Sequence, residues 1–177
     1  SFKDSRPARD KIFERLPATI LLNFAALFFT CIVAVPIGIY CAVKKDTFID
    51  KGLTVILFVC FSIPSFWLAL MFMILFGLQL GLVPISGLYS FNFDDMNIFM
   101  QIADISKHPV LPVAVSVIVS LATLSRYARS GMLEVLKQDY IKTAYAKGLS
   151  QKQVIFRHAL KNTLLPMITI IGLSIPA

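Results

Sequence analysis

Four stretches of this sequence contain no charged residue, and they constrain the fold more than any other feature. Neither Asp, Glu, Lys nor Arg occurs at 16–43, 52–93, 108–125 or 162–177. About 20 apolar helical residues cross the hydrocarbon core of a bilayer, so each of the first two stretches can hold a full span. The chain is 57% hydrophobic and only 15% charged, against about 25% charged residues in soluble domains. We therefore expect a polytopic membrane protein.

The expected fold class is an all-α, polytopic transmembrane helical bundle. Backbone groups in lipid must bond internally, which leaves helices or closed barrels. Apolar runs of this length lack the alternation of barrel strands. The expected spans are about 17–43, 52–80, 109–131 and 163–177.

Each expected span contains a proline. A proline removes one backbone donor and clashes with the preceding turn, so we expect a kink near each of them. The prolines expected to interrupt the four spans are Pro36, Pro64, Pro112 and Pro166.

The distribution of basic residues sets the expected orientation, because short cytoplasmic loops are enriched in Lys and Arg. Loop 44–51 has three lysines, and the segment 126–161 has eight basic residues against two acids. Both are expected in the cytoplasm. Loop 81–108 has three aspartates and one lysine, so we expect it outside. The sequence thus predicts an alternating topology at the inner or plasma membrane of the cell.

The first fifteen residues disagree with this topology, since they hold five basic residues and would lie outside. A missing upstream span could supply the dominant signal. Residue 1 is not methionine and residue 177 falls within an apolar run. We therefore expect a segment of a longer protein, truncated at both ends. The segment 1–15 is too polar for a signal peptide.

The polar segment 132–162, which we call the loop module, separates two apolar stretches. Gly148 suits the left-handed position that closes a helix. Ser150 is expected to start the next helix as its N-cap, with Gln153 completing a capping box. Leu149 and Val154 occupy the two positions of a hydrophobic staple. The sequence therefore predicts two short helices joined by a tight turn.

The helix before Gly148 is expected to have two faces. By helical spacing, Ile141 and Tyr145 share one face with Leu149. The other face carries Tyr140, Ala144 and Lys147, and small side chains near it (Thr143, Ala144 and Ala146) would let a neighbouring surface approach closely.

Two simpler interpretations of the loop module stay open at this point. It could be a basic loop that only sets topology. It could also be a DNA-binding helix-turn-helix, given the net charge of +7. Attachment to membrane spans at both ends disfavours the second, so no nucleic-acid partner is expected.

The residues of the module resemble a known family. "LSRYARSGMLEVLKQDYIKTAYAKGLSQKQVIFRHALKNTLLP" is similar to the cytoplasmic coupling loop of ABC importer permeases of the dipeptide/oligopeptide/nickel branch. "ERLPATILLNFAALFFTCIVAVPIGIYCAV", "FSIPSFWLALMFMILFGLQLGLVPISG" and "HPVLPVAVSVIVSLATLSRYARSGML" resemble its second, third and fourth spans. Of the broad importer pattern Glu-Ala-Ala, three residues, Gly, this chain keeps Ala144 and Gly148.

The resemblance implies a function and a set of partners. It implies one permease domain over 1–177, part of a six-span protein, with external loop 81–108 and coupling loop 132–162. The permease would form the path for peptides or similar small solutes. It would act with a second related permease, two cytoplasmic ATPase subunits, an external solute-binding protein and the lipid bilayer. It would not itself be an enzyme.

The resemblance also implies which residues act. Contact with the ATPase would involve part of segment 139–149, and a second group would form the turn and cap that follow. The first group is Asp139, Tyr140, Thr143, Ala144, Lys147 and Gly148. The second group is Leu149, Ser150, Gln153 and Val154.

Other candidate sites give weaker signals, and we expect no catalytic residue, metal or cofactor. Asp94 and Asp95 are expected to lie in a solvated loop. His108 and His158 have no further Cys or carboxylate ligands at the spacing of a metal site. Ser62 and Ser65 flank Pro64, where hydroxyls often bond to freed backbone groups. Cys31, Cys41 and Cys60 form no CxxC pair and read as small apolar residues.

The main alternative function belongs to another class. The chain could instead be an ion channel or a membrane-embedded enzyme, in which the basic loop would serve only to set the topology. However, the apolar runs hold no ionisable residue at depth, and such residues normally mark ion pathways. The chain also lacks the GxxxxGK[ST] phosphate-binding loop, so the ATPase of an ATP-driven system must be a separate partner.

Overall fold

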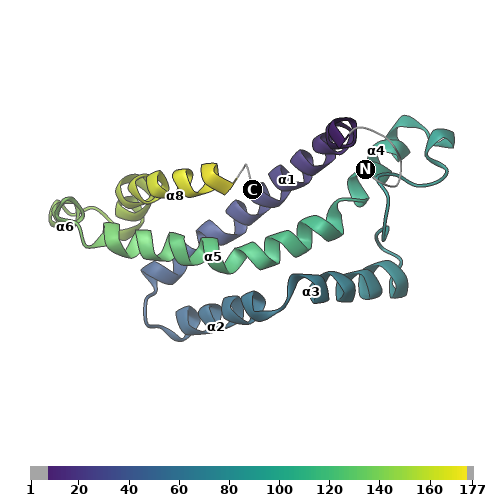
Figure 1. Ribbon diagram of the computed structural model, residues 1–177. Coiled ribbons are helices and arrows are strands. Elements are labelled where there is room, and N and C mark those ends of the chain that lie inside the picture. Colours follow the sequence, from purple (N-terminus) through teal and green to yellow (C-terminus); the bar gives the residue numbers. More distant parts are fainter. Residues whose placement is uncertain (1–7, 175–177) are drawn as a thin grey trace. The chain divides into compact units, whose positions relative to one another are not determined.

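The computed structural model describes residues 8–174, and every regular element in that range is a helix (Figure 1). The two longest are α1 (Ala8–Val43) and α5 (Val110–Leu136). The prediction of an all-α fold is confirmed. The other α-helices are α2 (Phe48–Ser62), α3 (Ser65–Phe72), α4 (Ile98–Lys107), α6 (Asp139–Ala146), α7 (Gln151–Gln153) and α8 (Leu160–Ser174). Two π-helical segments, η1 (Met73–Gln79) and η3 (Val154–Ala159), and a 3₁₀ turn, η2 (Phe93–Asp95), complete the set.

Two helical runs within residues 8–174 are long and apolar enough to cross a membrane. They are Ile12–Val43 and Ile98–Leu136, and α2 with α3 and η1 makes a third if that broken helix counts as one span. Many large apolar side chains on these helices are exposed, among them Phe24, Phe28 and Phe58. Such a surface suits contact with lipid or with further apolar helices.

Proline interrupts a helix at one of the four expected places. Ile63, at the end of α2, has the extended backbone (φ −76°, ψ 124°) that a following proline favours, and α3 begins after Pro64. The α-helix continues through Pro36 and Pro166. Pro112 lies in the first turn of α5, where an N–H would lack a helical partner in any case.

The chain divides into two compact units, each built from two separate segments. One contains the chain up to Leu27 together with Ser65–Ser116. The other contains Phe28–Pro64 together with the chain from Val117 onward. We describe them as the first unit and the second unit.

In the first unit, the loop at 81–108 is folded by local polar bonds. Ser90 donates to the Asp104 carboxylate from its backbone N–H (2.8 Å) and from its hydroxyl (2.5 Å). His108 Nδ1 lies 2.8 Å from the Asp104 carbonyl oxygen, and the Gln101 amide donates to Phe93 O (3.1 Å). Part of this loop is regular structure, since η2 and α4 lie in it.

In the second unit, α1 and α5 approach closely at a glycine. A Cβ added to Gly38 would collide with the Ser125 carbonyl oxygen and would lie 2.5 Å from Ala128 Cβ. Small residues bring membrane helices into such backbone contact. A buried cluster of Ala34, Leu124, Ala128 and Met167 continues this contact and includes α8.

Candidate functional site

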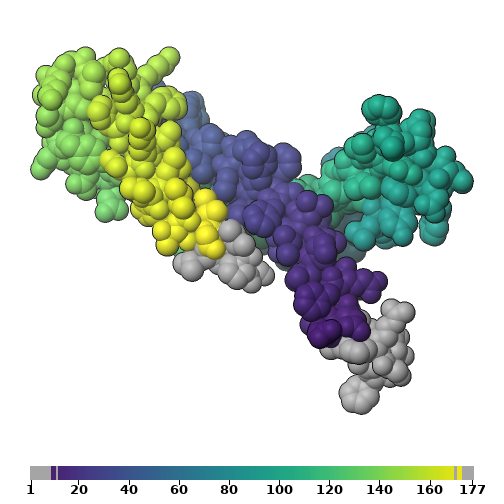
Figure 2. Space-filling model, turned by 90° about the horizontal axis from the view of Figure 1, so that it is seen from above, coloured from purple at the N-terminus to yellow at the C-terminus, as the bar shows by residue number. Residues whose placement is uncertain are grey.

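The loop module (132–162) begins in the last part of α5, contains α6, α7 and η3, and ends in the first residues of α8. Helical structure is unbroken from Gln151 to Ser174 (Figure 1). Figure 2 shows this part of the second unit, in light green and yellow, with its segments packed against one another. The module is therefore a folded element, and its hydrogen bonds and packing can be followed residue by residue.

The turn after α6 has a complete set of backbone bonds. Gly148 has φ +80°, a conformation that side chains with a Cβ rarely adopt. Its N–H donates to Tyr145 O (2.9 Å), and the Leu149 N–H donates to Ala144 O (3.3 Å). These two bonds form a Schellman motif, which satisfies the last carbonyl groups of a helix. A Cβ at Gly148 would meet nothing within 4 Å, so the glycine is required by the backbone conformation alone.

A capping box starts the next helix. The Gln153 N–H donates to Ser150 Oγ (3.4 Å), and the Ser150 N–H donates to Gln153 Oε1 (3.0 Å). Leu149, just before the cap, packs against a buried cluster that contains Val154. The turn and the cap together fix the direction in which the chain leaves α6.

Ser150→Ala is expected to weaken this start without unfolding the protein. Loss of an N-cap side chain costs about 1 kcal/mol, roughly a fivefold change in a local opening equilibrium. Backbone amides at 151–156 should exchange with deuterium about fivefold faster. Ser130→Ala, on the exposed side of α5, is the control and should leave their exchange unchanged. Equal exchange rates in Ser150→Ala and wild type would contradict the cap assignment.

The inward face of α6 is anchored in a buried cluster. Ile141 (1% exposed) and Ala144 (5% exposed) pack with Ala42 of α1 and Met132 of α5. Val154, Ile155 and Ala159 of η3 complete the cluster. The ends of α1 and α5 therefore support the module directly.

The position of Ala144 differs from the sequence expectation. We expected it on a docking face, separate from the face that carries Ile141. The two residues are three positions apart, which places them on neighbouring parts of the helix surface, and the cluster takes both. Ala144 is thus a core contact in this chain, and its small size lets α6 lie close to α5.

The outward face of α6 carries polar and exposed groups. Asp139 and Lys142 form an ion pair of 2.7 Å on the surface, with side chains 94% and 69% exposed; such pairs add little stability. Thr143 is exposed and its hydroxyl donates to Asp139 O (2.9 Å). Tyr140 accepts a bond from Asn162 Nδ2 (2.8 Å), which ties α6 to α8. Lys147, the last residue before Gly148, is also exposed.

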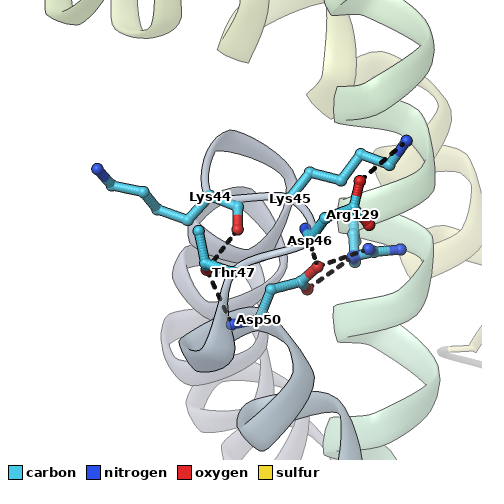
Figure 3. Close-up of polar contacts among 6 residues, drawn as sticks. All are labelled: Lys44, Lys45, Asp46, Thr47, Asp50 and Arg129. Atoms are coloured by element: carbon cyan, nitrogen blue, oxygen red, sulfur yellow. Dashed lines mark hydrogen bonds and ion pairs between the residues drawn. The ribbon is translucent and has the colours of Figure 1, made fainter.

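Figure 3 shows an ion pair between Asp50 and Arg129 that the sequence did not reveal. Arg129 of α5 donates to both carboxylate oxygens of Asp50, from Nε (3.1 Å) and from Nη2 (2.8 Å). The Asp50 side chain is 4% exposed and that of Arg129 is 32% exposed. The two residues are 79 positions apart and belong to no local motif, so no sequence signal could have joined them.

The remaining candidates do not assemble into a site. Among residues 8–174, no group of three or more His, Cys, Asp or Glu side chains could hold a metal ion. Asp94 and Asp95 lie in the exposed turn η2. Ser62 Oγ donates to Phe58 O (2.9 Å) beside the break at Pro64. The three cysteines are free thiols.

The long apolar helices are typical of a membrane protein. Comparison with known proteins identifies the family to which the chain belongs. Residues 34–177 match the family described as "Binding-protein-dependent transport system inner membrane component". The chain belongs to this family.

Three curated relatives have similar sequences over most of this chain. The oligopeptide transport system permease protein AppB of Bacillus subtilis is 40% identical over 97% of the chain. The di/tripeptide permease protein DppB of Pseudomonas aeruginosa is 37% identical over 90%, and the dipeptide permease protein DppB of Escherichia coli K12 is 36% identical over 99%. The chain covers 52%, 51% and 56% of these relatives, so it spans about half their length.

Proposed function

We propose that this chain is the membrane-spanning permease part of an ATP-driven importer of peptides. Its family consists of inner membrane components of binding-protein-dependent transport systems, and the similar proteins are named as permeases for oligopeptides, di- and tripeptides, and dipeptides. These names favour an importer over the ion channel or membrane-embedded enzyme considered above. The observation that carries the mechanism is the loop module, in which the inner face of α6 is buried and the outer face is exposed.

In this proposal the loop module is the coupling element. A separate ATPase binds the outward face of α6, at Asp139, Tyr140, Thr143 and Lys147, with Gly148 at its end. Ala144 has a different role, since it holds α6 against α1 and α5. Leu149, Ser150, Gln153 and Val154 fix the turn, so that a push on α6 is delivered to α8 and to the ends of α1 and α5.

The contacts of the module support the proposed topology. Loop 44–51 and the loop module are both assigned to the cytoplasm. Asp50 of loop 44–51 pairs with Arg129 of α5, and Ala42 at the end of α1 packs with Ile141 of the loop module, so the ends of these helices and their loops lie on the same side of the second unit. Loop 81–108 is assigned to the outside, where a solute-binding protein would deliver the peptide. A second related permease would complete the path.

Transport by the assembled complex tests the function. The full-length permease, its partner permease, two ATPase subunits and the binding protein are reconstituted in liposomes with ATP on the ATPase side. We expect ATP-dependent uptake of a labelled dipeptide or oligopeptide, and no uptake of a labelled sugar. Liposomes without the binding protein serve as the control. Peptide flux that is independent of ATP, or no peptide flux at all, would contradict the proposal.

A further inference from the structure

The Asp50 carboxylate is bonded by Arg129 of α5 and by the connection that precedes α2, and the Cys41 thiol of α1 lies beside it. Arg129 supplies two hydrogen bonds, and the Asp46 N–H supplies a third at 3.0 Å (Figure 3). A bidentate guanidinium–carboxylate pair fixes orientation as well as distance. Because Asp50 is nearly buried, it needs this partner: a buried charge without one is strongly unfavourable. The pair therefore determines how the start of α2 sits against α5.

The connection between α1 and α2, residues 44–47, is short and contains an unusual backbone conformation. Asp46 has φ +64°, which is unusual for a residue other than glycine. Thr47 is the N-cap of α2: its hydroxyl accepts from the Asp50 N–H (3.3 Å) and donates to Lys44 O (2.6 Å). These bonds shape the turn locally. They do not connect it to α5, and that connection is made by Arg129.

The apolar support of the loop module leaves α2 out. The cluster under α6 takes residues from α1, α5, α6 and η3, and the second cluster takes residues from α1, α5 and α8. Neither includes a residue of α2. Arg129 lies three residues before Met132, which the first cluster buries completely. The Asp50–Arg129 pair thus links α2 to the part of α5 on which the module rests.

We propose that Asp50 and Arg129 are a positioning pair that makes α2 move together with α5 when the loop module is displaced. The proposal rests on the proposed function and adds a route by which motion of the loop module reaches α2. A push on α6 reaches α1, α5 and α8 through apolar packing, and it reaches α2 through the ion pair. Without the pair, the start of α2 loses its bonded connection to α5. ATP hydrolysis then continues, but less of the motion reaches the transport path.

The test measures uptake and ATP hydrolysis together in the reconstituted complex. In Asp50→Asn and in Arg129→Gln, we expect peptide taken up per ATP hydrolysed to fall at least fivefold, with hydrolysis itself within twofold of wild type. The exchange Asp50→Arg with Arg129→Asp restores an ion pair and should recover the ratio to within twofold. Asp46→Asn is the matched control, because it removes a neighbouring carboxylate but keeps the N–H that bonds to Asp50, and it should leave the ratio unchanged.

Each other result has a defined meaning. Single variants with a wild-type ratio would overturn the pair, as would a ratio that falls equally in Asp46→Asn. Uptake and hydrolysis that fall in step with the amount of assembled complex would show a purely structural role and would also overturn it. If the single variants do not assemble, the exchanged pair decides, and a ratio reduced fivefold there rejects the proposal. A wild-type complex without ATP-dependent uptake would instead reject the proposed function, and this inference with it.

Discussion

Gly38→Val is expected to prevent stable packing of α1 against α5. The Cβ of any residue at this position would collide with the Ser125 carbonyl oxygen and lie 3.0 Å from the Arg129 backbone nitrogen. Neither backbone atom can move without shifting α5. Overpacking of this kind costs about 3 kcal/mol, a large part of the stability of an ordinary domain. In detergent, the full-length variant should lose most of its monodisperse fraction, and its unfolding midpoint should fall.

Gly52→Val is the matched control for this prediction. Gly52 lies on an exposed part of α2, and a Cβ there would meet nothing within 4 Å. This variant should behave as wild type in the same two measurements. If Gly38→Val matched wild type as well, the close approach of α1 and α5 would be wrong.

Gly148→Asp is expected to abolish ATP-driven uptake while leaving the protein folded. The left-handed backbone at φ +80° costs a residue with a Cβ about 1 kcal/mol, too little to unfold the chain. A Cβ at this position would meet nothing within 4 Å in this chain, and under the proposed function the added carboxylate would disturb the surface to which the ATPase binds. We expect uptake to fall at least tenfold, and ATP hydrolysis to be lost from the purified complex.

A second glycine in a left-handed conformation provides the control for this variant. Gly81 has φ +61° and open space around it, and it lies in the loop assigned to the outside. Gly81→Asp introduces a similar backbone strain and the same charge. The complex that contains this variant should nevertheless retain the ATPase subunits and their ATP hydrolysis. If both variants lost hydrolysis, backbone strain would explain the result and the docking role of Gly148 would lose its support.

Local signals in the sequence were sufficient for the turn of the loop module. A glycine followed two residues later by serine, with glutamine three residues further on, encodes both the left-handed position and the capping box, because each bond joins residues at most five apart. The helical structure of the apolar runs could also be predicted from the sequence, because runs of this length and composition form helices in a membrane.

Contacts between distant segments were not readable from the sequence. Helical spacing placed Ala144 away from Ile141, whereas the cluster is broad enough to bury both, because it combines α1, α5 and η3. The Asp50–Arg129 pair joins residues from two helices, and each residue alone looks like part of a basic loop. The bonds from Ser90 to Asp104 span 14 residues and fold a loop whose sequence showed only acidic character.

The most direct test of the coupling account is cross-linking from two adjacent positions of α6. Thr143 is exposed and Ala144 is 5% exposed, so Thr143→Cys and Ala144→Cys differ mainly in the direction of the thiol. After removal of the native cysteines, each variant is treated with a short thiol-to-amine cross-linker in the full-length complex. The account predicts that position 143 forms a product with the ATPase subunit, with a yield that changes on ATP addition, and that position 144 forms none. Equal yields at the two positions, or no product at 143, would contradict it.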